Sequence, residues 1–299
     1  MNSTLKGLIY GVFVSVTSVS LSTYSLAADN RGFDASHWAQ YDSEQTFEVD
    51  YKPMTSLLNF IQSADRSDST AAYQVVSGQS LSYLQTYKAY LEGISVSKLN
   101  RDEQLAYWLN LHNLGVIEKI ATNFKSRKKI KSLRGTPGDP GKWWIEKTFT
   151  VEGHRLSLED IEQGILFGAH AEPLAMYGLI YGVQGTTSIG TEAFKARTVR
   201  KQLKKLAREF VNDKKNVKVT RRGLQLNSLY VWNQEALFMN SQDSLLAHIN
   251  DYADDRLKIK LASLEGEYKV KHKFNWRTDA FVPPRQNVQL QSGGGGYGS

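Results

Sequence analysis

"NRDEQLAYWLNLHNLGVIEKIATNF", residues 100–124, has the strongest helical pattern of the chain. Its apolar side chains recur every three or four positions, which predicts one long amphipathic helix. The stripe comprises Leu105, Trp108, Leu109, His112, Val116 and Ile120. Asn100 is a good N-cap residue, and Glu103 follows at the spacing of a capping box. We therefore expect the strongest helix of the chain to begin here.

Three polar residues of this helix are candidates for a pocket. Asn110 and Asn113 lie three positions apart, so both project from a face beside the apolar stripe. An asparagine pair can hold an oxyanion or a sugar hydroxyl, whereas a buried asparagine more often satisfies backbone groups. His112 lies on the stripe itself, where a packing role is commoner than that of a base. Both alternatives stay open for all three residues.

Two later segments share one pattern, "KTFTVEGHRLSLEDIEQGIL" (147–166) and "NVKVTRRGLQLNSLYVWNQEAL" (216–237). In each segment apolar and polar residues alternate on both sides of a turn that ends in glycine, and a helical spacing of apolar residues follows. This pattern predicts a hairpin that leads into a helix. Ser157 caps the first helix, and Asn227 or Ser228 caps the second. Glu162 shares a face with apolar neighbours, so we expect it to point inward, as an acid or as a structural partner of the asparagines.

The remaining periodic segments complete a mainly helical α+β fold. Helices are expected over 79–94, over 241–252 and over 192–212, the last basic outside and apolar inside. We predict a single domain over 28–284 with two small antiparallel hairpins, each leading into a helix. The Gly-rich tail, 285–299, is expected to be disordered.

The first 27 residues have the pattern of a secretory signal peptide. An apolar run, "GLIYGVFVSV", is followed by Ser25 and Ala27, small residues that suit cleavage near Ala27. The alternative, a membrane anchor, is disfavoured because the run is short and interrupted by Ser and Thr. We expect an exported protein, periplasmic or secreted, with no later membrane span. The chain has no cysteine, which excludes thiol catalysis and Cys-type zinc sites.

The net charge of +7 is concentrated in clusters within 125–134, 195–208 and 214–222. The candidates for binding a polyanion are Lys128, Lys129, Arg200, Lys201, Lys204 and Lys205. Such clusters indicate an anionic envelope polysaccharide or protein partner, or only a solvated face that keeps the protein soluble. Nucleic acid is not expected, because the chain is predicted to be exported and has no recognised nucleic-acid motif.

"YGLIYGVQGTTSIG", residues 177–190, combines glycines with the hydroxyls of Thr186, Thr187 and Ser188. A hydroxyl nucleophile needs a nearby base, and the stretch supplies none. No nucleophile elbow, Walker loop or dinucleotide-binding fingerprint occurs in the chain. The six histidines show no metal-ligand spacing, so neither a metal nor a cofactor is expected.

Several motifs in order resemble the family known as domain of unknown function 547. They are "EQLAYWLNLHNLGVIEKI", "KTFTVEGHRLSLEDIEQGIL", "KKLAREFVNDKKNVKVTRRGLQLNSLYVWN" and "YKVKHKFNWRTDAF", and the resemblance covers roughly residues 33–282. The chain departs from the family at "EPLAMYGLIYGVQGTTSIG". Met176 stands where the family has a histidine, Tyr181 and Thr186 stand at its two cysteines, and Thr187 replaces its proline. Any chemistry of that His/Cys pair would be lost here.

Two functions follow from the sequence. The leading hypothesis is a non-catalytic exported protein, a binding or assembly factor for an anionic envelope component or a protein partner. The rival is a hydrolase or transferase whose pocket contains Asn110, His112, Asn113, Glu162, Thr186 and Ser188. The discriminating observation is whether these groups converge on an open cleft.

Overall fold

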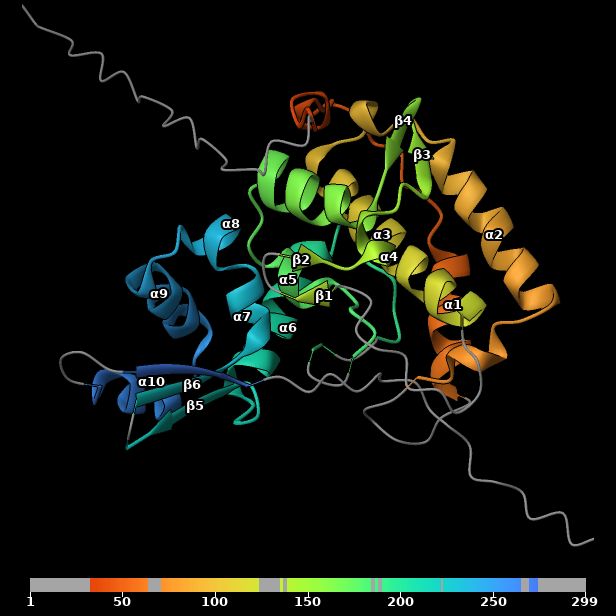
Figure 1. Cartoon of the computed structure of the whole chain (residues 1–299). Coiled ribbons are helices and arrows are strands. Elements are labelled where there is room, and N and C mark those ends of the chain that lie inside the picture. The colour runs from red at the N-terminus through yellow and green to blue at the C-terminus, as the bar shows by residue number, and fades with distance from the viewer. Residues whose placement is uncertain are drawn as a thin grey trace, which may run out of the picture.

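The structure is a computed structural model, and helix α3 (Arg101–Asn123) runs through the middle of it (Figure 1). The residues that the structure describes are 33–63, 71–123, 135–136, 139–183, 186–187, 190–221, 223–264 and 269–273. Every side chain of α3 from Glu103 to Ile117 is buried. A helix buried all round belongs to the core rather than to the surface. The predicted N-cap is confirmed, since the Asn100 side chain accepts the amide of Glu103 at 3.0 Å.

Helices α1 (Lys52–Ser63) and α2 (Gln79–Glu92) cover one flank of α3, at the right of Figure 1. Three short 3-10 turns accompany them, η1 (His37–Ala39), η2 (Tyr73–Val75) and η3 (Val96–Lys98). The α2 residues Leu84, Tyr87 and Leu91 are buried toward the core. The predicted helix over 79–94 is thus confirmed, with its end at Glu92.

The first predicted hairpin is formed by β3 (Phe149–Val151) and β4 (His154–Leu156), paired antiparallel. Its turn residues Glu152 and Gly153 both have positive φ, 47° and 79°, which is the signature of a tight type I′ turn. The hairpin leads into η4 (Asp160–Ala169), a π-helix. Ser157 caps the amino-terminal end of this helical segment, because its hydroxyl oxygen accepts a hydrogen bond from the backbone N–H of Asp160 at 3.1 Å.

The second predicted hairpin lies at the other end of the molecule, at the lower left of Figure 1. Strands β5 (Val217–Thr220) and β6 (Gly223–Asn227) pair antiparallel and lead into α7 (Ser228–Trp232), which the Asn227 side chain caps. Three helices follow: α8 (Gln234–Phe238), α9 (Gln242–Tyr252) and α10 (Asp255–Ala262). Strand β7 (Lys269–Lys273) then returns and pairs with β6 in parallel.

Short elements connect these parts. A two-residue pair, β1 (Gly135–Thr136) with β2 (Asp139–Pro140), precedes α4 (Lys142–Ile145). Helix α5 (Ala175–Gly178) precedes α6 (Val199–Asn212). One hydrophobic cluster joins the buried residues of all the long helices. Within the described residues, no helix has both the length and the apolar character needed to cross a bilayer.

The mainly helical α+β fold is confirmed, with two antiparallel hairpins that each lead into a helix. One boundary is wrong: the helix predicted over 192–212 begins only at Val199. The backbone N–H and C=O of Phe194 are both bound by the side chain of Asn110, so these groups are not available to a helix. The predicted signal peptide and the glycine tail lie outside the described residues, and the domain limits of 28–284 stay a prediction.

Candidate functional site

The two asparagines of α3 bind backbone on segments distant in sequence. Asn110 donates from Nδ2 to the carbonyl of Phe194 at 2.8 Å, and its Oδ1 accepts the amide of Phe194 at 3.0 Å. Asn113 donates to the carbonyl of Gly178 at 2.9 Å and accepts the amide of Ile180 at 2.8 Å. Both amide atoms of each side chain are therefore engaged. The pair fastens α3 to the chain after α5 and to the chain before α6.

Glu162 lies in the π-helix η4, and its side chain is fully buried. Its carboxylate accepts a hydrogen bond from Trp144 Nε1 at 2.9 Å and another from the Tyr181 hydroxyl at 3.2 Å. Gln163 Nε2 lies 3.1 Å from the same carboxylate. A buried carboxylate needs such donors because desolvation penalises its charge. π-Helical turns are rare and frequently occur at functional sites, which makes Glu162 a candidate for a functional acid.

Aromatic rings enclose this carboxylate. The Trp144 ring stacks on Tyr181, with centroids 5.7 Å apart and planes 13° apart. His112 meets Trp144 edge to face at 5.2 Å, and Trp232 lies 6.1 Å from Tyr181. The structure thus brings Glu162 and His112 to one indole, Trp144. The Glu162 carboxylate thus contacts the buried side chains of Trp144 and Tyr181 and the half-buried side chain of Gln163.

In the glycine-rich stretch, residues 177–190, the described threonine hydroxyls donate hydrogen bonds to backbone carbonyls of the same stretch. Thr186 donates to the carbonyl of Val183 and Thr187 donates to the carbonyl of Leu179, both at 2.9 Å. Ser188 lies outside the described residues. Met176, which the resemblance places opposite a histidine, is fully buried. The described contacts of Thr186 therefore hold the loop together and do not include an imidazole.

A second buried polar group was not foreseen from the sequence. The hydroxyl of Tyr177 lies 2.9 Å from His248 Nε2 and 3.2 Å from the hydroxyl of Tyr230, so it connects α5, α9 and α7. Burial lowers the pKa of His248 to about 4. Burial and the nearby cations Arg101 and Arg200 lower the pKa of His170 to about 3. No local pattern marks these histidines, because their partners come from distant parts of the chain.

The basic candidates on α6 divide into paired and unpaired groups. Arg200 is paired, with Asp102 at 2.7 Å and with Glu172 at 3.0 Å. Lys205 lies 3.8 Å from Glu209, at the limit of an ion pair. Lys201 and Lys204 are exposed and form no ion pair with a described residue. Lys128 and Lys129 lie outside the described residues.

The apolar face of α6 explains this arrangement. Val199, Leu203 and Phe210 are buried against the core. The helical period then directs Lys201 and Lys204 to solvent.

As for metals, the described residues contain no group of three His, Asp or Glu side chains arranged to hold an ion.

Comparison with known proteins supports the family resemblance. Residues 96–211 match a family model described as "Protein of unknown function, DUF547". The matched range includes α3, the first hairpin, the π-helix and most of α6, so the resemblance predicted from these motifs is confirmed there. No curated protein and no solved structure matches the chain.

Proposed function

We propose that the protein is a non-catalytic binding protein, exported from the cytoplasm, that holds an anionic polysaccharide of the cell envelope. One observation carries the proposal: Lys201 and Lys204 stand exposed on a rigid helix without a described counter-charge. A fixed array of unpaired cations attracts a polyanion and suppresses binding of cations. Because the helix is already folded, the conformational freedom lost on binding is mainly that of the lysine side chains.

The polar groups of the interior support the same proposal. Asn110 and Asn113 are engaged with backbone, and Glu162 is enclosed by Trp144 and Tyr181. Groups that already have internal partners gain little from a ligand, because each new hydrogen bond would replace an existing one. Lys201 and Lys204 have no ion-pair partner among the described residues that a ligand would have to replace.

The test is binding of polygalacturonate, a carboxylated polysaccharide, to residues 28–299 by calorimetry at low salt. We expect Lys201→Glu with Lys204→Glu to weaken binding at least about tenfold, because two attractions become repulsions. The matched control is Lys52→Glu with Lys98→Glu, two exposed lysines before α3. Equal binding by the α6 variant and the wild type would refute the proposal. Amino-terminal sequencing of the exported protein tests cleavage near Ala27.

A hydrolase or transferase is the second candidate, favoured by the π-helix that holds Glu162. To act as a general acid or base, this carboxylate must come within hydrogen-bond reach of a substrate, so Trp144 would have to move away. Glu162→Gln tests the idea on an activity screen of envelope glycans and esters. Loss of a measured activity with an unchanged melting temperature would favour the enzyme. A lower melting temperature alone assigns Glu162 a structural role.

A further inference from the structure

We propose that the outer face of the β5–β6–β7 sheet is a second contact surface for the anionic polysaccharide that α6 binds. The inference rests on the proposed function and names a further surface for it. Strand register carries it: Lys218 pairs with Gln225, and Gln225 pairs with Lys271. Residues directly opposite one another in a sheet project from the same face. Lys218, Gln225 and Lys271 therefore form one row across three strands.

Burial shows which face of the sheet this row occupies. Lys218 and Lys271 are exposed, and Gln225 is half-buried between them. The alternate positions Val217, Leu224 and Leu226 are buried, so the opposite face packs on the core. Because neighbouring strands lie about 4.8 Å apart, the two lysine Cα atoms are about 10 Å apart. The row holds two cations and no acid, and neither lysine forms an ion pair with a described residue.

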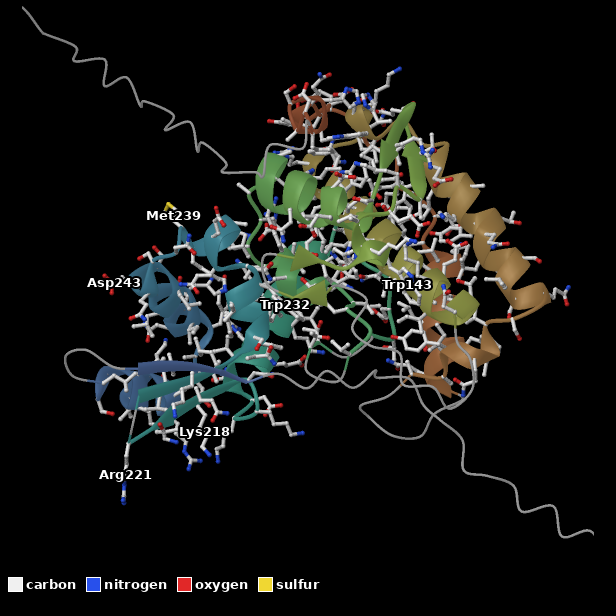
Figure 2. All side chains as sticks on the ribbon, in the orientation of Figure 1. Trp143, Lys218, Arg221, Trp232, Met239 and Asp243 are labelled. Atoms are coloured by element: carbon white, nitrogen blue, oxygen red, sulfur yellow. The ribbon has the colours of Figure 1, made fainter. Side chains whose placement is uncertain are left out.

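Further exposed cations lie just before and just after β5. Figure 2 shows Lys218 and Arg221 extending from the lower edge of the sheet, away from the rest of the molecule. Arg221 is exposed in the turn after β5. Lys214 and Lys215 are exposed between the end of α6 and the start of β5. The loops that lead into and out of β5 thus add cations at the ends of the strand that carries Lys218.

This arrangement fits a polymer better than a single ion. No two of these lysines share a buried pocket, so a small anion would stay hydrated and bind weakly. A polymer with regularly spaced carboxylates can contact the helix and the sheet together, and the second contact is then intramolecular. Gln225, between the lysines, offers an amide donor and acceptor that suit sugar hydroxyls.

The experiment compares a short galacturonate oligomer with long polygalacturonate by calorimetry over a series of salt concentrations. Three variants of equal charge change are used: Lys218→Gln with Lys271→Gln, Lys201→Gln with Lys204→Gln, and the control Lys52→Gln with Lys98→Gln. We expect the sheet variant to weaken binding of the long polymer severalfold. A plot of log affinity against log salt concentration should become shallower for this variant, by about 1.5 in the magnitude of its slope. Each lost cation–anion contact removes about 0.7–0.9 from that magnitude. The control should behave like the wild type.

The sheet inference and the proposed function fail differently. Wild-type affinity in the sheet variant, with weakened binding in the α6 variant, would overturn the inference alone. Wild-type affinity in both variants would overturn the proposed function as well. Duplex DNA bound as tightly as polygalacturonate at equal salt would overturn the choice of polysaccharide. If the sheet variant does not fold, Lys271→Gln alone replaces it, and Lys218→Arg with Lys271→Arg must retain full binding.

Discussion

Asn110 and Phe194 are joined by two hydrogen bonds that run in opposite directions between one side chain and one backbone unit. The asparagine amide thereby replaces the partners that a strand or helix would have given to Phe194. Asn113 does the same for Gly178 and Ile180. The central helix therefore binds the end of α5 and the segment before α6 through side-chain hydrogen bonds.

Replacing Asn110 should destabilise the fold strongly. Asn110→Ala leaves a buried N–H and a buried C=O without partners, and each costs about 1–3 kcal/mol. We expect the free energy of unfolding to fall by about 2–4 kcal/mol in urea titrations. Asn59 is the control, because its exposed amide also binds two carbonyls, those of Thr55 and Thr191. Equal costs for Asn110→Ala and Asn59→Ala would contradict the structural role.

Gly115 is required by the close approach of the first hairpin to α3. A Cβ placed on Gly115 would overlap the ring of Phe149 on β3, which is itself buried. Gly115→Ala should therefore lower the free energy of unfolding by about 1–3 kcal/mol, despite the better helix propensity of alanine. The added change Phe149→Leu should recover part of this loss in a double-mutant cycle.

Gly93 provides the comparison for this test. A Cβ there would meet the Tyr90 carbonyl at 3.5 Å, an ordinary contact. Gly93→Ala should be close to neutral. A purely additive cycle between positions 115 and 149 would show that the ring contact does not determine the cost.

Replacing the buried carboxylate of Glu162 should change both the stability of the fold and the spectroscopic signal of Trp144. Glu162→Leu removes the acceptor of Trp144 Nε1 and of the Tyr181 hydroxyl, and both of these donors are buried. We expect a loss of a few kcal/mol in stability and a changed near-ultraviolet circular dichroism spectrum. Glu162→Gln keeps one acceptor oxygen and should lose less. If both variants retain wild-type stability, these hydrogen bonds do not hold α4 to η4.

Stability should fall as the pH drops from about 6.5 to about 4. The pKa of His248 is lowered by burial to about 4 in the folded state, from 6.5 for an exposed histidine. The unfolded chain therefore binds this proton first, which favours unfolding below pH 6.5 by about 1.4 kcal/mol per pKa unit. His170, with a pKa of about 3, acts in the same direction.

The measurement is the free energy of unfolding as a function of pH, for the wild type and for His248→Gln. The glutamine can still bond the Tyr177 hydroxyl but does not titrate in this range. Its pH profile should be flatter than that of the wild type between pH 6.5 and 4. An identical slope in both proteins would exclude His248 as a source of the acid sensitivity.

Local signals in the sequence were sufficient for much of the fold. The cap at Asn100, the turn at Glu152 and Gly153 and the cap at Asn227 each depend on neighbouring residues, and each is confirmed. Glu162 was correctly expected to point inward, because helical spacing places it with Ile165 and Leu166. The π-helical form of that segment was not predictable, since its sequence has the ordinary pattern of an α-helix.

Long-range partners account for what the sequence did not reveal. Asn110 and Phe194 are 84 positions apart, and no periodicity links them. The late start of α6 follows from that contact, so the helix boundary was wrong for the same reason. The parallel pairing of β7 with β6 also needs tertiary structure, and with it the placement of Lys271 in line with Lys218.

A salt titration of polygalacturonate binding tests whether α6 binds an anionic polysaccharide through Lys201 and Lys204. The affinity of the wild type should fall steadily as salt rises, because each contact releases counterions. The variant with Lys201→Gln and Lys204→Gln should bind more weakly at low salt and show a shallower slope, whereas Lys52→Gln with Lys98→Gln should match the wild type. Identical slopes and affinities in all three proteins would contradict the claim.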